Sequence, residues 1–162
     1  GRLRNLLFEL RPPALDRADL ADALREHLAQ LRDESGLSVE LEDHAPTPLP
    51  EEIKVTAYRI AQEALANVRR HAAARSVRVV LDALDGGLLV RVVDDGIGFA
   101  ADEPRPAEPG HLGLEAMRER AEQAGGRLRV RSRPGAGTTV EAWLPLGGGS
   151  AATPPTPGSP GA

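Results

Sequence analysis

The sequence predicts an α+β fold: a two-layer α/β sandwich, with three helices on one face of a mixed, mostly antiparallel sheet of about five strands. One observation is the order of the periodic segments, which runs helix, strand, helix, hairpin, long loop, helix, hairpin. The other is composition. Hydrophobic residues make up 41% of the chain but aromatic residues only 2%, so aliphatic side chains must build the core.

The first eighteen residues are expected to be the end of a helical segment that precedes the main domain. In the stretch LRNLLFELRPPAL, a Pro-Pro pair ends a helix whose leucines repeat at helical spacing, namely Leu3, Leu6, Leu7 and Leu10. This stripe is too short to be stable alone, so we expect it to continue upstream and to pack against a partner helix.

A compact domain is expected over residues 19–147. Asp19 has the position of a helix N-cap, with Asp22 in the first turn, and the helix should end at Gly36. The alternating stretch LSVELED follows as a strand. After a Pro-rich connection, a second helix is predicted from about Glu51 to Ala73.

The rest of the domain predicts two hairpins around a third helix. SVRVVLDAL and LLVRVVDD are strands joined at an Asp-Gly-Gly turn. The loop FAADEPRPAEPGH has no periodicity, and its length suggests a functional lid. LGLEAMRERAEQAGG is a helix, and RLRVRSRPGAGTTVEAWLPL is a closing hairpin that turns between Pro134 and Gly137. The tail, residues 148–162, should be disordered because it has almost nothing to bury.

The composition excludes several classes of function. A net charge of −4 gives no reason to expect direct nucleic-acid binding. Lys54 is the only lysine and no Walker-type P-loop occurs, while the absence of cysteine excludes thiolate metal sites and disulfides. No apolar run approaches the length of a membrane span. We therefore expect this chain to be soluble.

The second helix carries an unusual set of polar residues. Glu63, Asn67 and His71 recur every four residues, with Glu63 at the edge of the apolar side and the other two drifting further into it. A carboxylate and an amide oxygen suit a Mg²⁺ ion that keeps some waters and is shared with phosphate. The alternative is a solvated helix flank with an ordinary surface histidine.

The stretch VVDDGIGF places an acid at the end of a strand. Asp94 could accept a hydrogen bond from an exocyclic amino group such as that of adenine, and Gly96 and Gly98 would let the backbone approach a flat ring. The alternative is a simple turn, because Asp-Gly sequences are common turn formers.

Two further glycine motifs are candidate binding elements. In GHLGLEAM, Gly110 and Gly113 flank the start of a helix whose unpaired amides could bind phosphate, and His111 between them is a candidate phosphate contact. In PGAGTT, the hydroxyl of Thr138 could bond a base directly or through water. Loop flexibility and a plain hairpin are the alternatives.

Taken together, these motifs resemble the ATP-binding domain of sensor histidine kinases, within the superfamily that includes gyrase, heat-shock protein 90 and the mismatch-repair ATPases. EALANVRRH resembles the N box, DDGIGF and GHLGL the two glycine boxes, and GAGTTV the closing Gly-Thr element. The segments LRNLLFELRPPALDRADLADAL and LEAMRERAEQAGG are similar to the nitrate-sensor-like subfamily.

The resemblance implies a role for each candidate residue on the second helix. Asn67 would be a ligand of Mg²⁺, and Glu63 would support the water shell of the metal or act as a base. His71 would lie near the phosphates of ATP as a cationic or hydrogen-bonding group.

The glycine motifs receive roles by the same resemblance. Asp94 would bind the adenine amino group, and Gly96 and Gly98 would make room for the ring. Thr138 would bond toward the adenine. The lid hinge and the phosphate-binding helix start would be formed by Gly110, Gly113 and Leu114.

The implied function is the catalytic half of a kinase that transfers the γ-phosphate of ATP to a histidine on its own dimerisation helix. A response regulator, of the kind with a helix-turn-helix output domain, would receive the phosphoryl group on an aspartate. His27 lies after the prolines and is not that acceptor, so the acceptor lies outside this chain. We expect a homodimer for the longer protein, a monomer for this piece, and a cytoplasmic domain whose parent protein could be membrane-anchored.

Two alternatives remain at this point. An anti-sigma-type kinase shares the ATP site but phosphorylates serine on a protein antagonist, and it does not need the leucine-rich opening segment. A nucleotide-sensing module would have the site without turnover.

Overall fold

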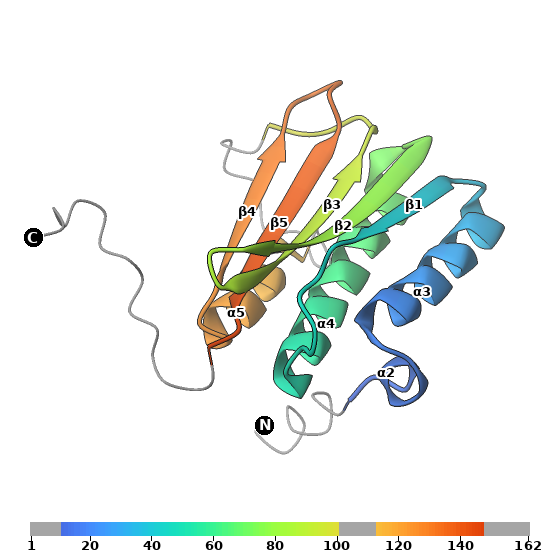
Figure 1. Cartoon of the computed structure of the whole chain (residues 1–162). Helices are drawn as coiled ribbons and strands as arrows, with labels where there is room; N and C mark the ends of the chain where they lie inside the picture. The colour runs from blue at the N-terminus through green and yellow to red at the C-terminus, as the bar shows by residue number, and fades with distance from the viewer. Residues whose placement is uncertain (1–10, 101–112, 148–162) are drawn as a thin grey trace, which may run out of the picture.

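The computed structural model describes residues 11–100 and 113–147 of the chain. Within these ranges the predicted order of helices and strands is confirmed (Figure 1). In chain order the elements are α2 (Ala14–Arg17), α3 (Leu20–Ser35), β1 (Ser38–Asp43), α4 (Glu51–Asn67), the π-helical turn η1 (Val68–Ala72), β2 (Ser76–Leu84), β3 (Gly87–Asp94), α5 (Leu114–Gln123), β4 (Arg127–Ser132) and β5 (Thr138–Pro145).

The sheet has five strands in the order β1-β2-β3-β5-β4. β1 pairs with β2 in parallel, and the other three pairings are antiparallel. The helices α3, α4 and α5 cover one face, and the opposite face is open (Figure 1). The predicted fold class, a mixed and mostly antiparallel sheet under three helices, is confirmed.

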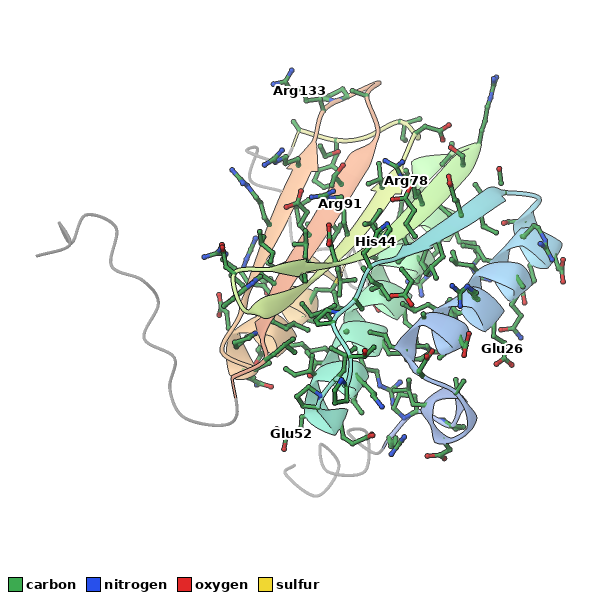
Figure 2. All side chains as sticks on the ribbon, viewed as in Figure 1. Glu26, His44, Glu52, Arg78, Arg91 and Arg133 are labelled. Carbon is green, nitrogen blue, oxygen red and sulfur yellow. The ribbon has the colours of Figure 1, made fainter. Side chains whose placement is uncertain are left out.

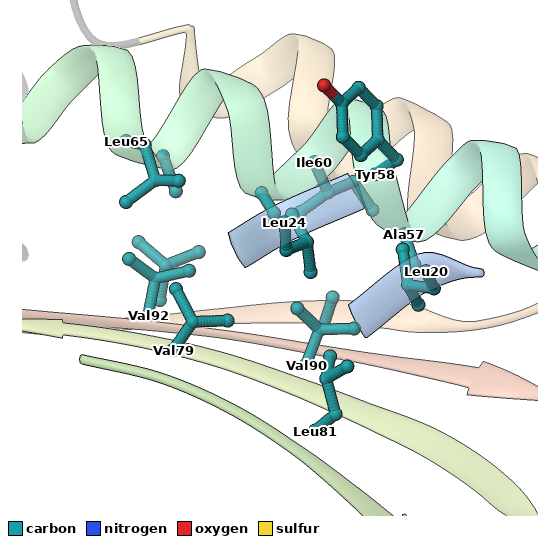
Figure 3. Close-up of a cluster of buried hydrophobic side chains, with 14 of the residues drawn as sticks. Leu20, Leu24, Ala57, Tyr58, Ile60, Leu65, Val79, Leu81, Val90 and Val92 are labelled. Carbon is teal, nitrogen blue, oxygen red and sulfur yellow. The ribbon is translucent and has the colours of Figure 1, made fainter. Parts of the chain in front are cut away.

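The core lies between the two layers and is aliphatic, as the composition requires. Figure 3 shows side chains of β2 and β3 pointing toward α3 and α4, with Val79, Leu81, Val90 and Val92 on the sheet side. From the helices, Leu24, Ile60 and Leu65 meet them, each at most 1% exposed. Leu15 of α2 belongs to the same core, so the segment before α3 is packed against the domain.

Local capping fixes the limits of α3 as predicted. The carboxylate of Asp19 accepts a hydrogen bond from the backbone N–H of Asp22 at 2.9 Å. Gly36 ends the helix with φ of 75°, a left-handed conformation that glycine adopts without steric penalty, and its N–H donates to the carbonyl of Arg32.

The second predicted helix ends differently from expectation. After Asn67 the chain continues as the π-helical turn η1 and stops at Ala73, which has φ of 48°. A wider π turn advances each residue through a smaller angle than an α turn, so the helical-wheel position predicted for His71 no longer holds. His71 is exposed rather than turned into the apolar side, whereas Glu63 and Asn67 are half-buried.

Some predicted features lie outside the described residues. These are the leucine stripe from Leu3 to Leu10, the loop at 101–112 with Gly110 and His111, and the tail at 148–162. Among the helices that the model does describe, none has the length and apolarity needed to cross a bilayer.

Candidate active site

The end of α4 and the end of β3 lie at the same end of the two layers, and Asp95 ties them together. Its Oδ1 accepts hydrogen bonds from the backbone N–H groups of Arg75 at 2.8 Å and Ser76 at 2.9 Å. Its Oδ2 accepts from the hydroxyl of Ser76 at 2.9 Å. Because Arg75 and Ser76 come three and four residues after the last helical turn, Asn67 and Asp94 belong to one end of the domain.

Asp94 is the last residue of β3 and lies opposite Thr138 on β5. Its side chain is buried, with 8% of the residue exposed, and Oδ1 accepts a hydrogen bond from the N–H of Gly96 at 2.8 Å. Burial raises the pKa of Asp94 above its ordinary value of 3.8, although hydrogen bonds from the backbone of Gly96 and Thr138 act in the opposite direction. A buried carboxylate with this cost needs a further partner to stabilise its charged form.

The neighbouring carboxylate behaves in the opposite way. Asp95 is exposed, and hydrogen bonds from the backbone of Ser76 and Arg75 and from the Ser76 hydroxyl lower its pKa below 3.8. Two adjacent acids therefore have different environments: Asp95 is exposed and held by three hydrogen bonds that favour its charged form, whereas Asp94 is buried and burial disfavours its charged form.

The glycines of this region let backbone segments approach each other closely. A Cβ at Gly98, which has φ of 64°, would collide with the backbone carbonyl of Arg133. A Cβ at Gly137, with φ of 76°, would collide with the backbone carbonyl of Asp94. The turn of the β4–β5 hairpin thus lies directly on the end of β3. The room at Gly98 is occupied by this turn, whereas the sequence suggested that it would be left for a ligand.

A small hydroxyl network supports the same corner. The hydroxyl of Ser132 accepts from the N–H of Phe99 at 2.8 Å and donates to the carbonyl of Gly137 at 3.1 Å. Ser132 Oγ also lies 2.8 Å from Thr138 Oγ1. Either hydroxyl can be the donor in this contact, and the oxygen of Thr138 keeps at least one lone pair in both cases.

On the helical layer, Glu63 lies against the start of α5. A Cβ at Gly113 would collide with the carboxylate of Glu63, and Gly113 is the N-cap of α5 with φ of 54° and no side-chain cap. One turn further along α4, the side-chain oxygen Oδ1 of Asn67 is buried. Leu114 packs against the core and anchors the beginning of α5.

The structure therefore brings most of the predicted site residues to one end of the molecule: Glu63, Asn67, Asp94, Gly96, Gly98, Gly113, Leu114 and Thr138. His71 is also on the last helical turn but is exposed. The sequence interpretation missed Asp95 and Ser132. Two signals were available, namely the second acid of DDG and the hydroxyl that precedes PGAG.

The donor set at this end fits Mg²⁺ in one specific way. The described residues contain no group of three or more histidine, aspartate or glutamate side chains that could hold a metal by themselves. Asn67 Oδ1 and the Glu63 carboxylate are hard oxygen donors one helical turn apart, which suits an ion that keeps several waters and shares phosphate ligands.

A comparison with protein families adds an independent observation. Residues 52–148 match the family described as histidine kinase-, DNA gyrase B- and HSP90-like ATPases. The chain belongs to this family. The match begins in α4 and extends just beyond β5, so it contains every site residue described above.

Sensor histidine kinases are among the relatives in this family. The chain is 35% identical over 146 residues to the sensor histidine kinase LiaS of Bacillus subtilis, covering 90% of this chain and 39% of that protein. It is 40% identical over 141 residues to the nitrate/nitrite sensor protein NarQ of Escherichia coli, covering 86% of this chain and 24% of that protein. The chain thus spans well under half the length of these relatives.

Solved structures agree. The histidine kinase domain of the Erythrobacter litoralis EL346 blue-light activated histidine kinase matches with a TM-score of 0.65 and 26% identity, covering 79% of this chain and 61% of that one. The Acinetobacter baumannii histidine kinase AdeS shares the fold alone, with a TM-score of 0.62 and 14% identity. The chain is a histidine kinase-like, ATP-binding ATPase domain homologous to a part of the sensor histidine kinases.

Proposed function

We propose that this chain is the catalytic part of a sensor histidine kinase that transfers the γ-phosphate of ATP to a histidine on its dimerisation helix. The phosphoryl group then passes to an aspartate of a response regulator. The observation that carries the proposal is the buried carboxylate of Asp94 at the end of β3, at the same end of the domain as the buried amide oxygen of Asn67. The relatives, among them NarQ, support it.

Asp94 selects the base. Asp94 already accepts backbone hydrogen bonds from Gly96 and Thr138, and a carboxylate has lone pairs beyond these two that accept from the exocyclic amino group of adenine. Guanine presents a carbonyl at that position, which would meet a carboxylate with no proton between them. Thr138 lies opposite Asp94 on β5 and offers oxygen lone pairs to the base or to a bridging water. Gly96 and Gly98 shape the turn that follows Asp94.

Asn67 and Glu63 hold the metal end of the nucleotide. When bound with ATP, Mg²⁺ neutralises the negative charge that develops on the transferred phosphoryl group. Asn67 would contribute its buried oxygen as a ligand of the metal, and Glu63 would support the water shell of the metal or act as the base that takes the proton of the attacking imidazole. His71, exposed on the π turn that follows α4, contacts phosphate oxygens in this proposal.

The start of α5 binds the phosphates. Gly113 caps the helix without a side-chain bond, so its first N–H groups are available to an anion. Leu114 fixes this end by packing on the core. Gly110 precedes it in the sequence and completes the lid hinge in this proposal, and His111 contacts phosphate. Catalysis in such a site is mainly positioning and electrostatic stabilisation.

The partners follow from the kinase assignment. They are the dimerisation helix of the same protein, which carries the acceptor histidine, and a response regulator with a helix-turn-helix output domain. The parent protein is a homodimer with this domain in the cytoplasm, and residues 1–18 lead into it from the dimerisation segment. Relatives that are sensor histidine kinases favour this proposal over the anti-sigma-type kinase and the nucleotide sensor.

The proposal is tested with Asn67→Ala. Removing the amide should abolish the Mg²⁺-dependent gain in affinity for a non-hydrolysable ATP analogue, measured by calorimetry with and without Mg²⁺. Gln30→Ala, which removes an amide from α3, is the matched control and should bind as the wild type does. An Mg²⁺ effect of wild-type size in Asn67→Ala would refute the metal site. The chain alone should show at most slow hydrolysis and no radiolabel from γ-labelled ATP.

A further inference from the structure

The open face of the sheet carries charges that nucleotide binding does not use. Figure 2 shows Arg78 and Arg91 over this face, away from the helices. Each has an acidic partner on a neighbouring strand. Arg78 lies 3.5 Å from Glu42, and the Nε of Arg91 lies 3.3 Å from Glu141. Over the middle of the sheet, therefore, the charges are balanced within the protein.

The edge strand β4 is different. Arg127, Arg129 and Arg131 alternate with Leu128 and Val130, whose side chains belong to the core. The three arginines therefore share the open face, spaced about 6.7 Å apart as every second residue of a strand is. All three are exposed. We call them the β4 arginine row; it concentrates three positive charges in a chain whose net charge is −4.

No acid of the described structure neutralises the β4 arginine row. None of the three makes an ion pair or a side-chain hydrogen bond within residues 11–100 and 113–147. Glu141 lies opposite Arg129 on β5, but its carboxylate is engaged by Arg91. Arg127 lies over the ring of Trp143, 5.2 Å from the ring centroid, which leaves its N–H donors available.

The backbone of β4 is also incompletely paired. β4 is the last strand in the sheet order and pairs only with β5. Among the described residues, no backbone hydrogen bond joins its other edge to another segment. Such an edge is a template for one more strand, whether from an aggregating copy or from a partner.

We propose that the outer edge of β4 is a docking surface for an extended, acidic segment of a partner protein. The segment adds to the sheet as a sixth strand through backbone hydrogen bonds. Acidic side chains at every second position then lie opposite the β4 arginine row, as cross-strand pairs do. The row determines which partner binds, because an uncharged or basic strand would leave the arginines without partners.

The surface does not fit a membrane or a nucleic acid as well. The exposed large apolar side chains of the described structure are Leu84 and Ile97, and neither lies on β4, so the row has no apolar group to insert into a bilayer. Bases would need an open aromatic face for stacking. Trp143 offers none beside the row, because Arg127 covers its ring and its Nε1–H donates to the carbonyl of Leu84 at 2.7 Å.

The test uses the whole chain and a labelled synthetic peptide of nine residues in which Glu and Thr alternate. Fluorescence anisotropy should show saturable binding that weakens as NaCl rises from 50 to 500 mM, since the distance over which exposed charges are screened falls from about 14 Å to about 4 Å. A peptide of the same composition with its Glu residues in one block should bind more weakly. Backbone amide shifts on binding should map to β4 and not to α3 or β1.

The decisive variant is R127E/R129E/R131E, and its control is R25E/R32E/R118E, which changes the net charge equally on the helical layer. Reversal of the row should weaken peptide binding at least about tenfold, while the control and the nucleotide affinity stay at wild-type values. Thermal unfolding verifies that both variants fold. Equal affinity for the two peptides, equal loss in both variants, or stronger binding to single-stranded RNA or phosphatidylserine vesicles would each overturn the proposal. The arginines would then only protect the edge from aggregation.

Discussion

Each end of the sheet has a glycine packed against a backbone carbonyl and a polar side chain nearby, but the two ends serve different purposes. One end of the sheet holds the β2–β3 hairpin turn, and we call it the hairpin end. There Gly126 lets α5 turn into β4 against the backbone carbonyl of Trp143, and the indole N–H of Trp143 donates to the carbonyl of Leu84. At the site end, Gly137 lets the β4–β5 turn lie on the carbonyl of Asp94. The polar group of the hairpin end is satisfied by the protein, whereas Asp94 is buried with a raised pKa.

This difference shows where the fold gives up stability. A Trp N–H bonded to a carbonyl contributes to the native state without needing a ligand. A carboxylate whose pKa is raised by burial destabilises the folded protein when it is charged. Substitutions at the two ends should therefore separate effects on stability from effects on nucleotide binding.

The largest effects are expected from the paired substitutions Gly137→Ala and Gly126→Ala. In both, the new Cβ would collide with a backbone carbonyl, so each should lower the free energy of unfolding by about 1–3 kcal/mol or more. Only Gly137→Ala should also impair ATP binding, because it displaces the end of β3. Denaturant unfolding and calorimetry measure the two quantities. Equal losses of affinity in the two variants would contradict the division of roles.

A smaller effect on stability alone is expected for Trp143→Phe. This change removes the hydrogen bond to Leu84 and weakens the contact with Arg127, so the free energy of unfolding should fall by about 1 kcal/mol. The affinity for ATP should not change, since Trp143 lies at the far end of the sheet. A change of more than threefold in the affinity for ATP, measured where both proteins are fully folded, would show that the two ends are coupled.

The two adjacent acids should respond to pH in opposite directions. The stabilising contribution of protonated Asp94 is present below pH 3.8 and is lost as the pH rises through its raised pKa. That of Asp95 is present above pH 3.8 and is lost as the pH falls through its lowered pKa. Urea unfolding from pH 3 to 7 should show Asp94→Asn gaining stability relative to wild type as the pH rises. A constant difference would disprove the raised pKa.

The smallest effect is expected for Asp95→Asn. An amide can accept from only one of its two terminal atoms, so one side of the three-bond clamp to Arg75 and Ser76 is lost. Because the clamp positions Asp94 indirectly, we expect ATP affinity to fall by about threefold, less than the tenfold that a lost hydrogen bond to a charged group can cost. Ser38→Ala, a neutral change on the adjacent strand β1, is the control.

The sequence predicts the features that depend on neighbours in the chain. The Asp19 cap, the Gly36 stop and the Asp85–Gly86 hairpin turn are short-range patterns, and all are confirmed. The parallel pairing of β1 with β2 is set by packing over a long sequence separation, and the sequence indicates only that the sheet is mixed.

At the site too, the sequence predicts what depends on chain neighbours and misses what depends on residues far apart in the sequence. The motifs locate Asp94 and Asn67, but the role of Asp95 depends on bonds to residues about twenty positions away. The π turn at Val68–Ala72 has no local signature and changes the direction of His71. Gly98 has a motif position that suggests ligand approach, yet the atom that excludes a Cβ is the carbonyl of Arg133.

The claim that Asp94 recognises adenine is tested most directly by calorimetric titration of the wild type and Asp94→Asn with Mg²⁺-bound ATP and GTP analogues. Loss of a hydrogen bond to a charged group predicts that ATP affinity falls by about 10–100-fold in the variant. The wild type should prefer ATP to GTP, and the variant should lose most of this preference while folding at least as stably at neutral pH. A variant that binds ATP as tightly and as selectively as the wild type would show that Asp94 does not recognise adenine.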